Sequence, residues 1–256
     1  MSSTGDAASG APLPARVQAY IEALVQTCTQ KCASLVSVVL FGSAAQGGFS
    51  GAVSDVDVII VVSDAVSRAD RLRLSEDVAR LESLHELRPA NIDSPGRVQA
   101  RIERAVGHAF SCFVCTRSDL ISGEVARVLD LRAWEAPFVD RIIFASIVAS
   151  ATTVWGEDLL PHVQVPPLRR LDVFKALFGS SGQVLLSAVM FPVLSDATKY
   201  AMGALKHSLH SCFFCYHQRT ATLEDEVAFF NPRLARAVLW WSCSRCAGST
   251  GGRSRS

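Results

Sequence analysis

The sequence lacks an excess of charge of either sign, and its charged residues are few. In 256 residues there are 25 Lys and Arg against 24 Asp and Glu, and these four types make up 19% of the chain. A nearly neutral chain has no long-range field to attract a polyanion, so we expect no nucleic-acid partner. With 49% hydrophobic residues, the bulk of the chain is also too apolar to be intrinsically disordered.

Long apolar runs are missing as well. The most apolar windows, 142–155 and 184–194, are shorter than the roughly 18 residues that a membrane-spanning helix needs. We interpret both as buried helices and expect no membrane partner. The first 14 residues lack the basic start and apolar stretch of a secretory signal. We therefore expect a cytoplasmic protein whose eight cysteines are free thiols.

The order of predicted elements divides the chain into two domains. Small residues and prolines fill 1–14, and Gly, Ser and Arg dominate 247–256, so both are predicted to be flexible tails. Helices and strands alternate over 15–160, whereas 166–246 is predicted to be helical after the proline-rich stretch 161–167. The predicted fold class is an α/β (α+β) domain followed by an all-helical C-terminal domain. Strands are predicted at 35–41, 55–62 and 109–116, and helices at 15–32, 67–87, 97–106, 137–155, 168–190, 195–217, 222–230 and 233–243.

Two aspartates at the start of the second predicted strand are the strongest chemical signal. Asp55 and Asp57 are two residues apart, so their side chains leave the same face of the sheet. Two neighbouring carboxylates repel each other and resist burial. A divalent cation removes both penalties, because hard oxygen ligands at this spacing can share a Mg²⁺ ion. The alternative interpretation is a structural turn with an acidic strand end.

A glycine and a serine follow the first predicted strand. Gly42 lets the backbone approach a ligand closely, and Ser43 can cap a short helix whose free N–H groups would hold a phosphate. A phosphate-holding turn beside a Mg²⁺-binding carboxylate pair is the minimum needed to activate a nucleoside triphosphate. Each half of this signal is weak, and the specificity lies in the ordered combination.

These residues resemble a known family. Phe41-Gly42-Ser43 followed by Ser54-Asp55-Val56-Asp57 is similar to the hG[GS]-x(9–13)-Dh[DE]h motif of the DNA polymerase β-like nucleotidyltransferase superfamily, in particular its minimal and antibiotic-modifying members. The segment 153–160 (TVWGEDLL) and the helical second half are also similar to such proteins. The resemblance implies a mixed sheet, a nucleoside triphosphate substrate and two Mg²⁺ ions. The implied reaction transfers a nucleoside monophosphate, with AMP expected, to a hydroxyl of a small molecule or protein and releases pyrophosphate.

The resemblance also implies roles for single residues. Asp55 and Asp57 would be the catalytic metal ligands, Gly42 and Ser43 would hold the β- and γ-phosphates, and Ser54 would shape the turn before Asp55. In the family's layout a helix of the second domain faces the cleft, so Lys206, together with Lys199, becomes a candidate for neutralising phosphate charge. A solvated helix face is the alternative for both lysines.

Two departures from the family pattern leave other functions open. Active members place a third carboxylate on a later strand, but 110–115 contains no acid, and Glu86, Asp93 and Asp119 are the fallbacks. Gln46 also stands where a basic residue often precedes the second glycine. A nucleotide-binding regulator that has lost the chemistry, or a partner in a toxin–antitoxin pair, therefore remains an alternative.

Metal binding by cysteine is a further alternative. Three Cys-x-x-Cys pairs begin at Cys112, Cys212 and Cys243, a spacing that zinc sites use. The first pair lies on a predicted strand, where an offset of three residues puts the side chains on opposite faces. The second lies on a predicted helix among phenylalanines, where free cysteine is an ordinary core residue. The sequence thus favours structural thiols.

Overall fold

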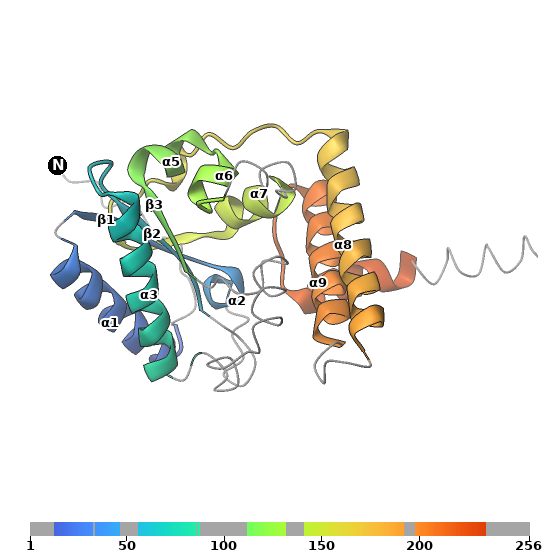
Figure 1. The fold of residues 1–256 in the computed structure, drawn as a ribbon. Coiled ribbons are helices and arrows are strands. Elements are labelled where there is room, and N and C mark those ends of the chain that lie inside the picture. Colours follow the sequence, from blue (N-terminus) through green and yellow to red (C-terminus); the bar gives the residue numbers. More distant parts are fainter. Residues whose placement is uncertain are drawn as a thin grey trace, which may run out of the picture.

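A mixed four-stranded sheet lies at the centre of the structure (Figure 1), a computed structural model that describes residues 13–32, 34–46, 56–85, 87, 112–131, 141–191 and 198–233. Its strands are β1 (Leu35–Phe41), β2 (Asp57–Val62), β3 (Cys112–Thr116) and β4 (Thr152–Gly156), in the order β3-β2-β1-β4. β1 is antiparallel to both β2 and β4, and β2 is parallel to β3. The α/β fold expected from the sequence, with its mixed sheet, is confirmed.

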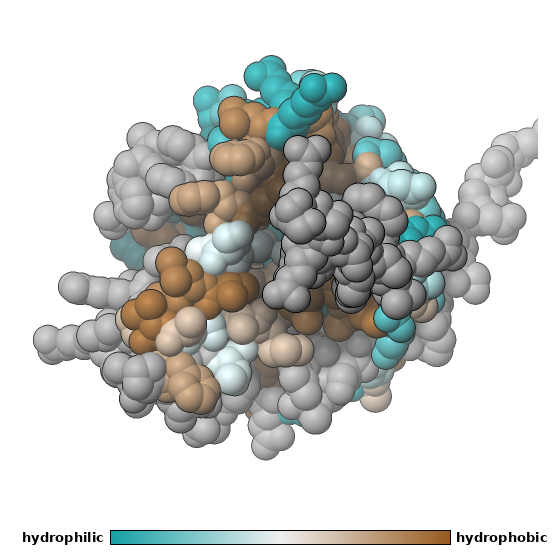
Figure 2. All heavy atoms as spheres, turned by 90° about the vertical axis from the view of Figure 1, so that its right-hand side faces the viewer, coloured by the Kyte–Doolittle hydropathy of each residue, from teal (hydrophilic) through white to brown (hydrophobic). Residues whose placement is uncertain are grey.

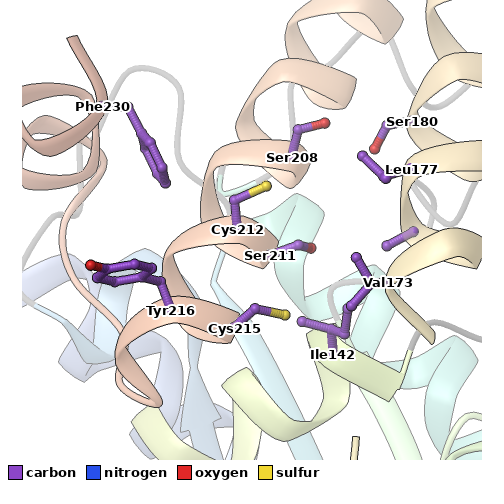
Figure 3. A pocket seen from close by; sticks show the side chains of 11 residues that line it. Ile142, Val173, Leu177, Ser180, Ser208, Ser211, Cys212, Cys215, Tyr216 and Phe230 are labelled. Atoms are coloured by element: carbon purple, nitrogen blue, oxygen red, sulfur yellow. The ribbon is translucent and has the colours of Figure 1, made fainter. Parts of the chain in front are cut away.

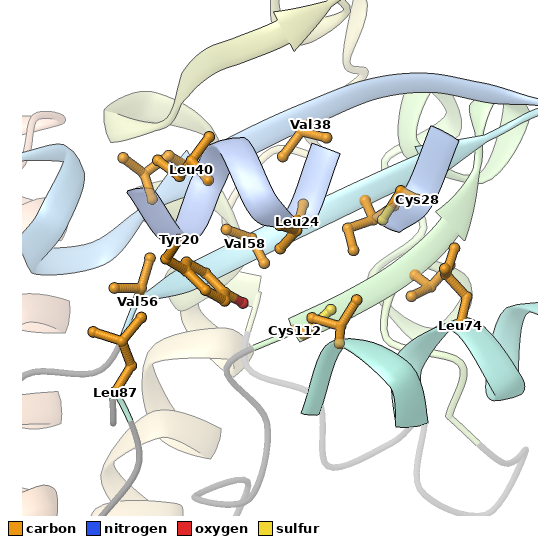
Figure 4. Packing of buried hydrophobic residues seen from close by; sticks show 14 of the residues in the cluster. Tyr20, Leu24, Cys28, Val38, Leu40, Val56, Val58, Leu74, Leu87 and Cys112 are labelled. Atoms are coloured by element: carbon orange, nitrogen blue, oxygen red, sulfur yellow. The ribbon is translucent and has the colours of Figure 1, made fainter. Parts of the chain in front are cut away.

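Helices cover both faces of the sheet. Because successive strand residues point to opposite faces, Val38, Val58 and Ile60 face one layer, while Val39 and Ile59 face the other. The first layer contains α1 (Ala15–Lys31) and α3 (Arg68–Leu84), whose packing against the sheet is shown in Figure 4. The second contains α5 (Arg117–Ser122), α6 (Val125–Val128) and α7 (Arg141–Ser150). β1 and β2 are therefore buried on both sides.

The predicted helix 137–155 is wrong in its second half. α7 ends at Ser150, and residues 152–156 form β4, which pairs with β1. The segment Thr152-Thr153-Val154-Trp155 consists of β-branched and aromatic residues, which fit a pleated strand better than a helix. Gly156 ends β4 with a φ of +83°, a conformation that glycine adopts without strain.

The spacing of Leu74, Val78, Leu81 and Leu84 predicts the inward face of α3, and the last of these positions is wrong. Leu74 and Val78 are buried as expected, but Leu84 is 79% exposed. The buried positions of α3 follow a four-residue spacing, so Glu82 takes the next inward place and Leu84 is rotated away from the sheet. Tyr20 of α1 lies over Glu82, with 3.4 Å between the hydroxyl and a carboxylate oxygen. This contact gives the buried carboxylate a polar partner.

The described C-terminal region is helical, as predicted. It contains α8 (Arg170–Met190), α9 (Thr198–His217) and a helix at 223–233. The predicted helices 97–106 and 233–243 lie outside the described residues, apart from residue 233, as does Ser195. α8 is, by length and composition alone, long and apolar enough to cross a membrane, and only 17% of its most apolar window is buried. This finding corrects the expectation that no segment reaches that length. The prediction of a buried helix at 184–194 is also wrong for its described part, where Val184, Leu185 and Val189 are exposed.

Two buried thiols predict how stability changes in alkaline solution. Burial raises the pKa of Cys28 and of Cys115 to about 12 each, from an ordinary value of 9.0. The folded protein then keeps protons that the unfolded chain loses, so the free energy of unfolding should fall as the pH rises from about 9 towards 12. In a Cys28→Ala, Cys115→Ala double variant, the thermal unfolding temperature should fall less steeply with rising alkaline pH than in the wild type. Equal slopes would contradict this assignment.

Candidate active site

The end of β1 and the start of β2 bring the two halves of the sequence motif together. Phe41, the last residue of β1, is the cross-strand partner of Asp57, the first residue of β2. The chain turns at Gly42, which has a φ of +70° and opens the short helix α2 (Gly42–Ala45). A Cβ at Gly42 would lie 3.3 Å from the Asp57 Cγ and closer still to Oδ2. Only a glycine backbone can therefore approach this carboxylate so closely.

Aromatic side chains lie on the face of the sheet that carries Asp57. Cross-strand partners share a face of the sheet, so Asp57 lies on the same side as Phe41, whose ring stacks on that of Phe113 with 6.1 Å between centroids. Asp57 itself is half-buried, and the strand that follows it is fully buried. The carboxylate thus stands at the edge of a low-dielectric region, where its interaction with a cation is stronger than in water.

Of the other predicted residues of the motif, the structure describes Ser43 but not Ser54 or Asp55. Ser43 follows Gly42 in α2 and is half-buried. Asp55 and Ser54 lie outside the described residues, so the predicted carboxylate pair is described only in its second member, Asp57.

Asp119 is not positioned to be the third carboxylate. β2 and β3 run parallel, with Val58 opposite Cys112 and Val62 opposite Thr116. Asp119 follows the far end of β3, roughly 13 Å or more along the strands from Asp57. Its carboxylate accepts the hydrogen bond of the Thr116 hydroxyl and forms an ion pair with Arg71 at 3.1 Å. Asp119 thus has a structural role in capping α5.

The remaining fallbacks and the two lysines stay predictions. Glu86 and Asp93 lie outside the described residues. Lys206 is exposed on α9, and no described hydrogen bond or ion pair joins it to Gly42 or Asp57. Lys199 is on the same helix, with a side chain outside the description. Their predicted role in phosphate binding stays a prediction.

The first Cys-x-x-Cys pair is buried in the core as predicted, but the second is not, because Cys212 is exposed and Cys215 is half-buried. Cys112 packs into the core on the α1 side of the sheet and Cys115 into the core on the opposite side, as the strand periodicity predicted. Cys212 and Cys215 lie on α9. Within the described ranges, no group of three His, Cys, Asp or Glu side chains could hold a metal ion. Cys243 and Cys246 lie outside them.

A cavity separates the helices of the C-terminal region. It has a volume of about 360 Å³ and lies between α7, α8, α9 and the helix 223–233 (Figure 3). Ile142 and Phe230 form apolar walls, and the Ser211 Oγ at its edge is buried without a hydrogen-bond partner. Its lining includes no residue of α2 or β2. No sequence pattern predicts this cavity, because its walls come from four separate helices.

α7 connects the turn to the helical region. It contacts α2 on one side and α8 and α9 on the other. The helical region therefore lies on the side of the sheet to which Gly42 and α2 belong, as Figure 1 also shows.

Several solved structures are similar to this chain, all with low identity. A spectinomycin adenyltransferase, AAD(9), from Enterococcus faecialis, solved with ATP and spectinomycin, is 10% identical, with 82% of this chain and 80% of that chain covered and a TM-score of 0.45. A toxin–antitoxin structure with AMP-PNP is 14% identical, with coverages of 71% and 98% and a TM-score of 0.27. The complex of a tri-AMPylated HEPN toxin from Shewanella oneidensis with its MNT antitoxin is 12% identical, with coverages of 71% and 98% and a TM-score of 0.27. All three TM-scores are below 0.5.

A family match gives a firmer result. No curated protein sequence matches the chain. Residues 21–104, in contrast, match the family described as the nucleotidyltransferase domain, and this range contains β1, Gly42, Ser43 and Asp57. The resemblance inferred from the motif is thereby confirmed. Residues 21–104 thus match a nucleotidyltransferase domain, and this match supports a transferase enzyme.

Proposed function

We propose that this protein transfers a nucleoside monophosphate, with AMP the expected group, from a nucleoside triphosphate to a hydroxyl of a small molecule or protein, with release of pyrophosphate. The observation that carries the proposal is the approach of Gly42 to the Asp57 carboxylate inside the matched domain. A glycine turn offers backbone N–H groups to a phosphate, and a carboxylate at the start of the neighbouring strand offers an oxygen ligand to a divalent cation.

The residues at the turn fit Mg²⁺. Asp57 supplies a carboxylate, the hard oxygen ligand that Mg²⁺ prefers, and Gly42 leaves its surroundings open where a side chain would collide with it. Asp55 and Asp57 would hold the metal, with two ions expected. When bound, Mg²⁺ would stabilise the negative charge that develops on the transferring phosphoryl group.

The chain's own residues would orient the triphosphate. Gly42 and Ser43 would hold the β- and γ-phosphates through backbone N–H groups, Ser54 would shape the turn that presents Asp55, and Lys206 would neutralise phosphate charge from the helical region. The helical region would also exclude water, so that the acceptor hydroxyl is the group that reacts.

Removal of the metal is expected to abolish transfer. The test is pyrophosphate release from ATP, GTP, CTP or UTP with a panel of hydroxyl-bearing acceptors, in Mg²⁺ and then in excess chelator. We expect a loss of about a hundredfold or more, because a bound metal contributes several kcal/mol of charge stabilisation. Added Mg²⁺ should restore the rate. Acceptor-dependent release that persists unchanged in chelator would contradict the proposal.

A nucleotide-binding regulator is the second candidate. The described strand β3, next to β2, carries no acid, and its described positions on the face of Asp57 are Phe113 and Cys115. A protein without the third carboxylate can keep triphosphate binding and lose turnover. Calorimetric binding of a triphosphate without pyrophosphate release with any acceptor would favour this candidate.

A further inference from the structure

The cavity between α7, α8, α9 and the helix 223–233 reaches into the interior of the helical region. Four of its lining residues are at most 7% exposed and form its floor: Ile142, Ala176, Ser180 and Ser211. Its rim is open to solvent, because the lining residue Tyr216 is 71% exposed. The cavity thus offers a ligand both an entrance and a buried floor.

The lining of the cavity is apolar and uncharged. Hydrophobic side chains gather on the face of the molecule seen in Figure 2, at the end that carries α8 and α9 in Figure 1. The described lining contains no charged side chain, and its polar groups are hydroxyls and thiols, those of Ser180, Ser208, Ser211, Cys212, Cys215 and Tyr216. A charged molecule would lose its hydration there without gaining an ionic partner. The lining therefore favours a neutral ligand.

The Ser211 hydroxyl supplies a second, independent observation. Ser211 is 5% exposed, and its Oγ is buried without a hydrogen-bond partner. Figure 3 shows its side chain pointing from α9 towards α8, into the space that the cavity occupies. A buried hydroxyl without a partner is destabilising, and native proteins pair the large majority of such groups. A ligand with one hydrogen-bonding group at this point would supply the partner.

A water molecule or a peptide satisfies these conditions less well. A buried water makes about two to four hydrogen bonds, and a water at Ser211 would leave the apolar remainder of the cavity unfilled. A peptide would bring backbone N–H and C=O groups, which need partners that apolar walls lack. A small molecule that is mostly apolar fills the cavity and leaves no polar group unpaired.

The volume of the cavity sets the size of the ligand. An apolar cavity of about 150 Å³ holds one benzene molecule. On the same scale, the volume of about 360 Å³ has room for roughly 14 non-hydrogen atoms. A bicyclic aromatic molecule with one substituent is of this size.

The side chains around the cavity favour an aromatic ligand over an aliphatic one. The rings of Tyr216 and Phe230 lie on the side of the cavity away from α8 (Figure 3). Aromatic rings attract one another in stacked and edge-to-face arrangements. The sulfur atoms of Cys212 and Cys215 belong to the same lining, and sulfur is polarizable and packs well against rings.

We propose that this cavity binds a neutral bicyclic aromatic molecule, whose hydroxyl or carbonyl group forms a hydrogen bond with Ser211. This inference is independent of the proposed function, because the described lining includes no residue of α2 or β2. Its test measures binding to the full chain and involves no transfer reaction.

Calorimetric titration of the full chain with 2-naphthol, a bicyclic aromatic alcohol, tests the proposal. We expect saturable binding of one molecule per chain, with a dissociation constant below about 1 mM. In Ser211→Ala, this constant should rise about three- to tenfold, the factor that one hydrogen bond contributes. The dissociation constant of 2-methylnaphthalene, which has nearly the same shape but no hydroxyl, should not rise. An unchanged affinity of Ser211→Ala for 2-naphthol would overturn the proposal.

Filling the cavity is the second test. Cys212 lines the cavity and is exposed, so the ring of Cys212→Trp can enter the cavity without displacing the buried core. Binding of both probes should then be lost, because the ring occupies their volume. Met202→Trp, at a 65% exposed position of α9 outside the described lining, is the matched control and should bind like the wild type. Circular dichroism checks that both variants fold. No saturable binding by the wild type, or equal binding by the two tryptophan variants, would contradict the proposal.

Discussion

Asp57→Asn is expected to reduce nucleotidyl transfer by about a hundredfold or more and to leave the fold intact. The amide has nearly the shape of the carboxylate but no charge, so it cannot hold a divalent cation against the triphosphate. Loss of several kcal/mol of transition-state stabilisation corresponds to this factor, since about 1.4 kcal/mol is tenfold in rate. The measurement is Mg²⁺-dependent pyrophosphate release with the best acceptor.

Glu76→Gln is the matched control for this substitution. Glu76 is an exposed carboxylate on α3, away from the turn, and the change to an amide is the same in kind. Its activity should equal that of the wild type. Full activity in Asp57→Asn, with a thermal unfolding temperature like that of the control, would remove Asp57 from the site and with it the assignment of the turn.

Gly42→Ala should damage both stability and activity. At a φ of +70° an alanine costs about 1–2 kcal/mol. Its methyl group would also push against the Asp57 carboxylate. A displacement of about 1 Å in a catalytic group can cost about a hundredfold in rate. Thermal unfolding and pyrophosphate release, measured on the same preparation, separate the two effects.

Gly179→Ala provides the comparison. Gly179 lies in α8 with open space around it, so alanine there should stabilise the helix by about 0.5–1 kcal/mol and leave the activity unchanged. If Gly42→Ala behaved like Gly179→Ala in both measurements, the close approach of Gly42 to Asp57 would have no functional meaning.

The buried strands could be predicted because their sequences are unambiguous. The runs 35–41 and 57–62 are apolar and rich in β-branched residues, and the turn signal Gly42-Ser43 lies at the end of the first. Both strands appear with nearly the expected bounds, and the antiparallel register then sets Phe41 opposite Asp57. The sequence thus predicted that the turn at Gly42 and the aspartate at the start of β2 belong to one site.

Other features depend on contacts that periodicity alone does not reveal. β4 was hidden because the apolar run of α7 continues into it without a polar break, and only pairing with β1 makes it a strand. Asp119 was a candidate for the third carboxylate because the sequence does not reveal the direction of β3 relative to β2. The parallel pairing of these strands places Asp119 at the end of the sheet away from Asp57. The outward orientation of the apolar side chains of α8 likewise depends on which face α9 covers.

The position of β4 in the chain has a consequence for synthesis. The Ser37 hydroxyl of β1 donates a hydrogen bond to the Trp155 carbonyl, 118 residues later. A growing polypeptide on the ribosome therefore exposes one hydrogen-bonding edge of β1 until β4 has left the exit tunnel. Unpaired edges invite aggregation, so chaperone binding to nascent chains should end once residue 156 has emerged.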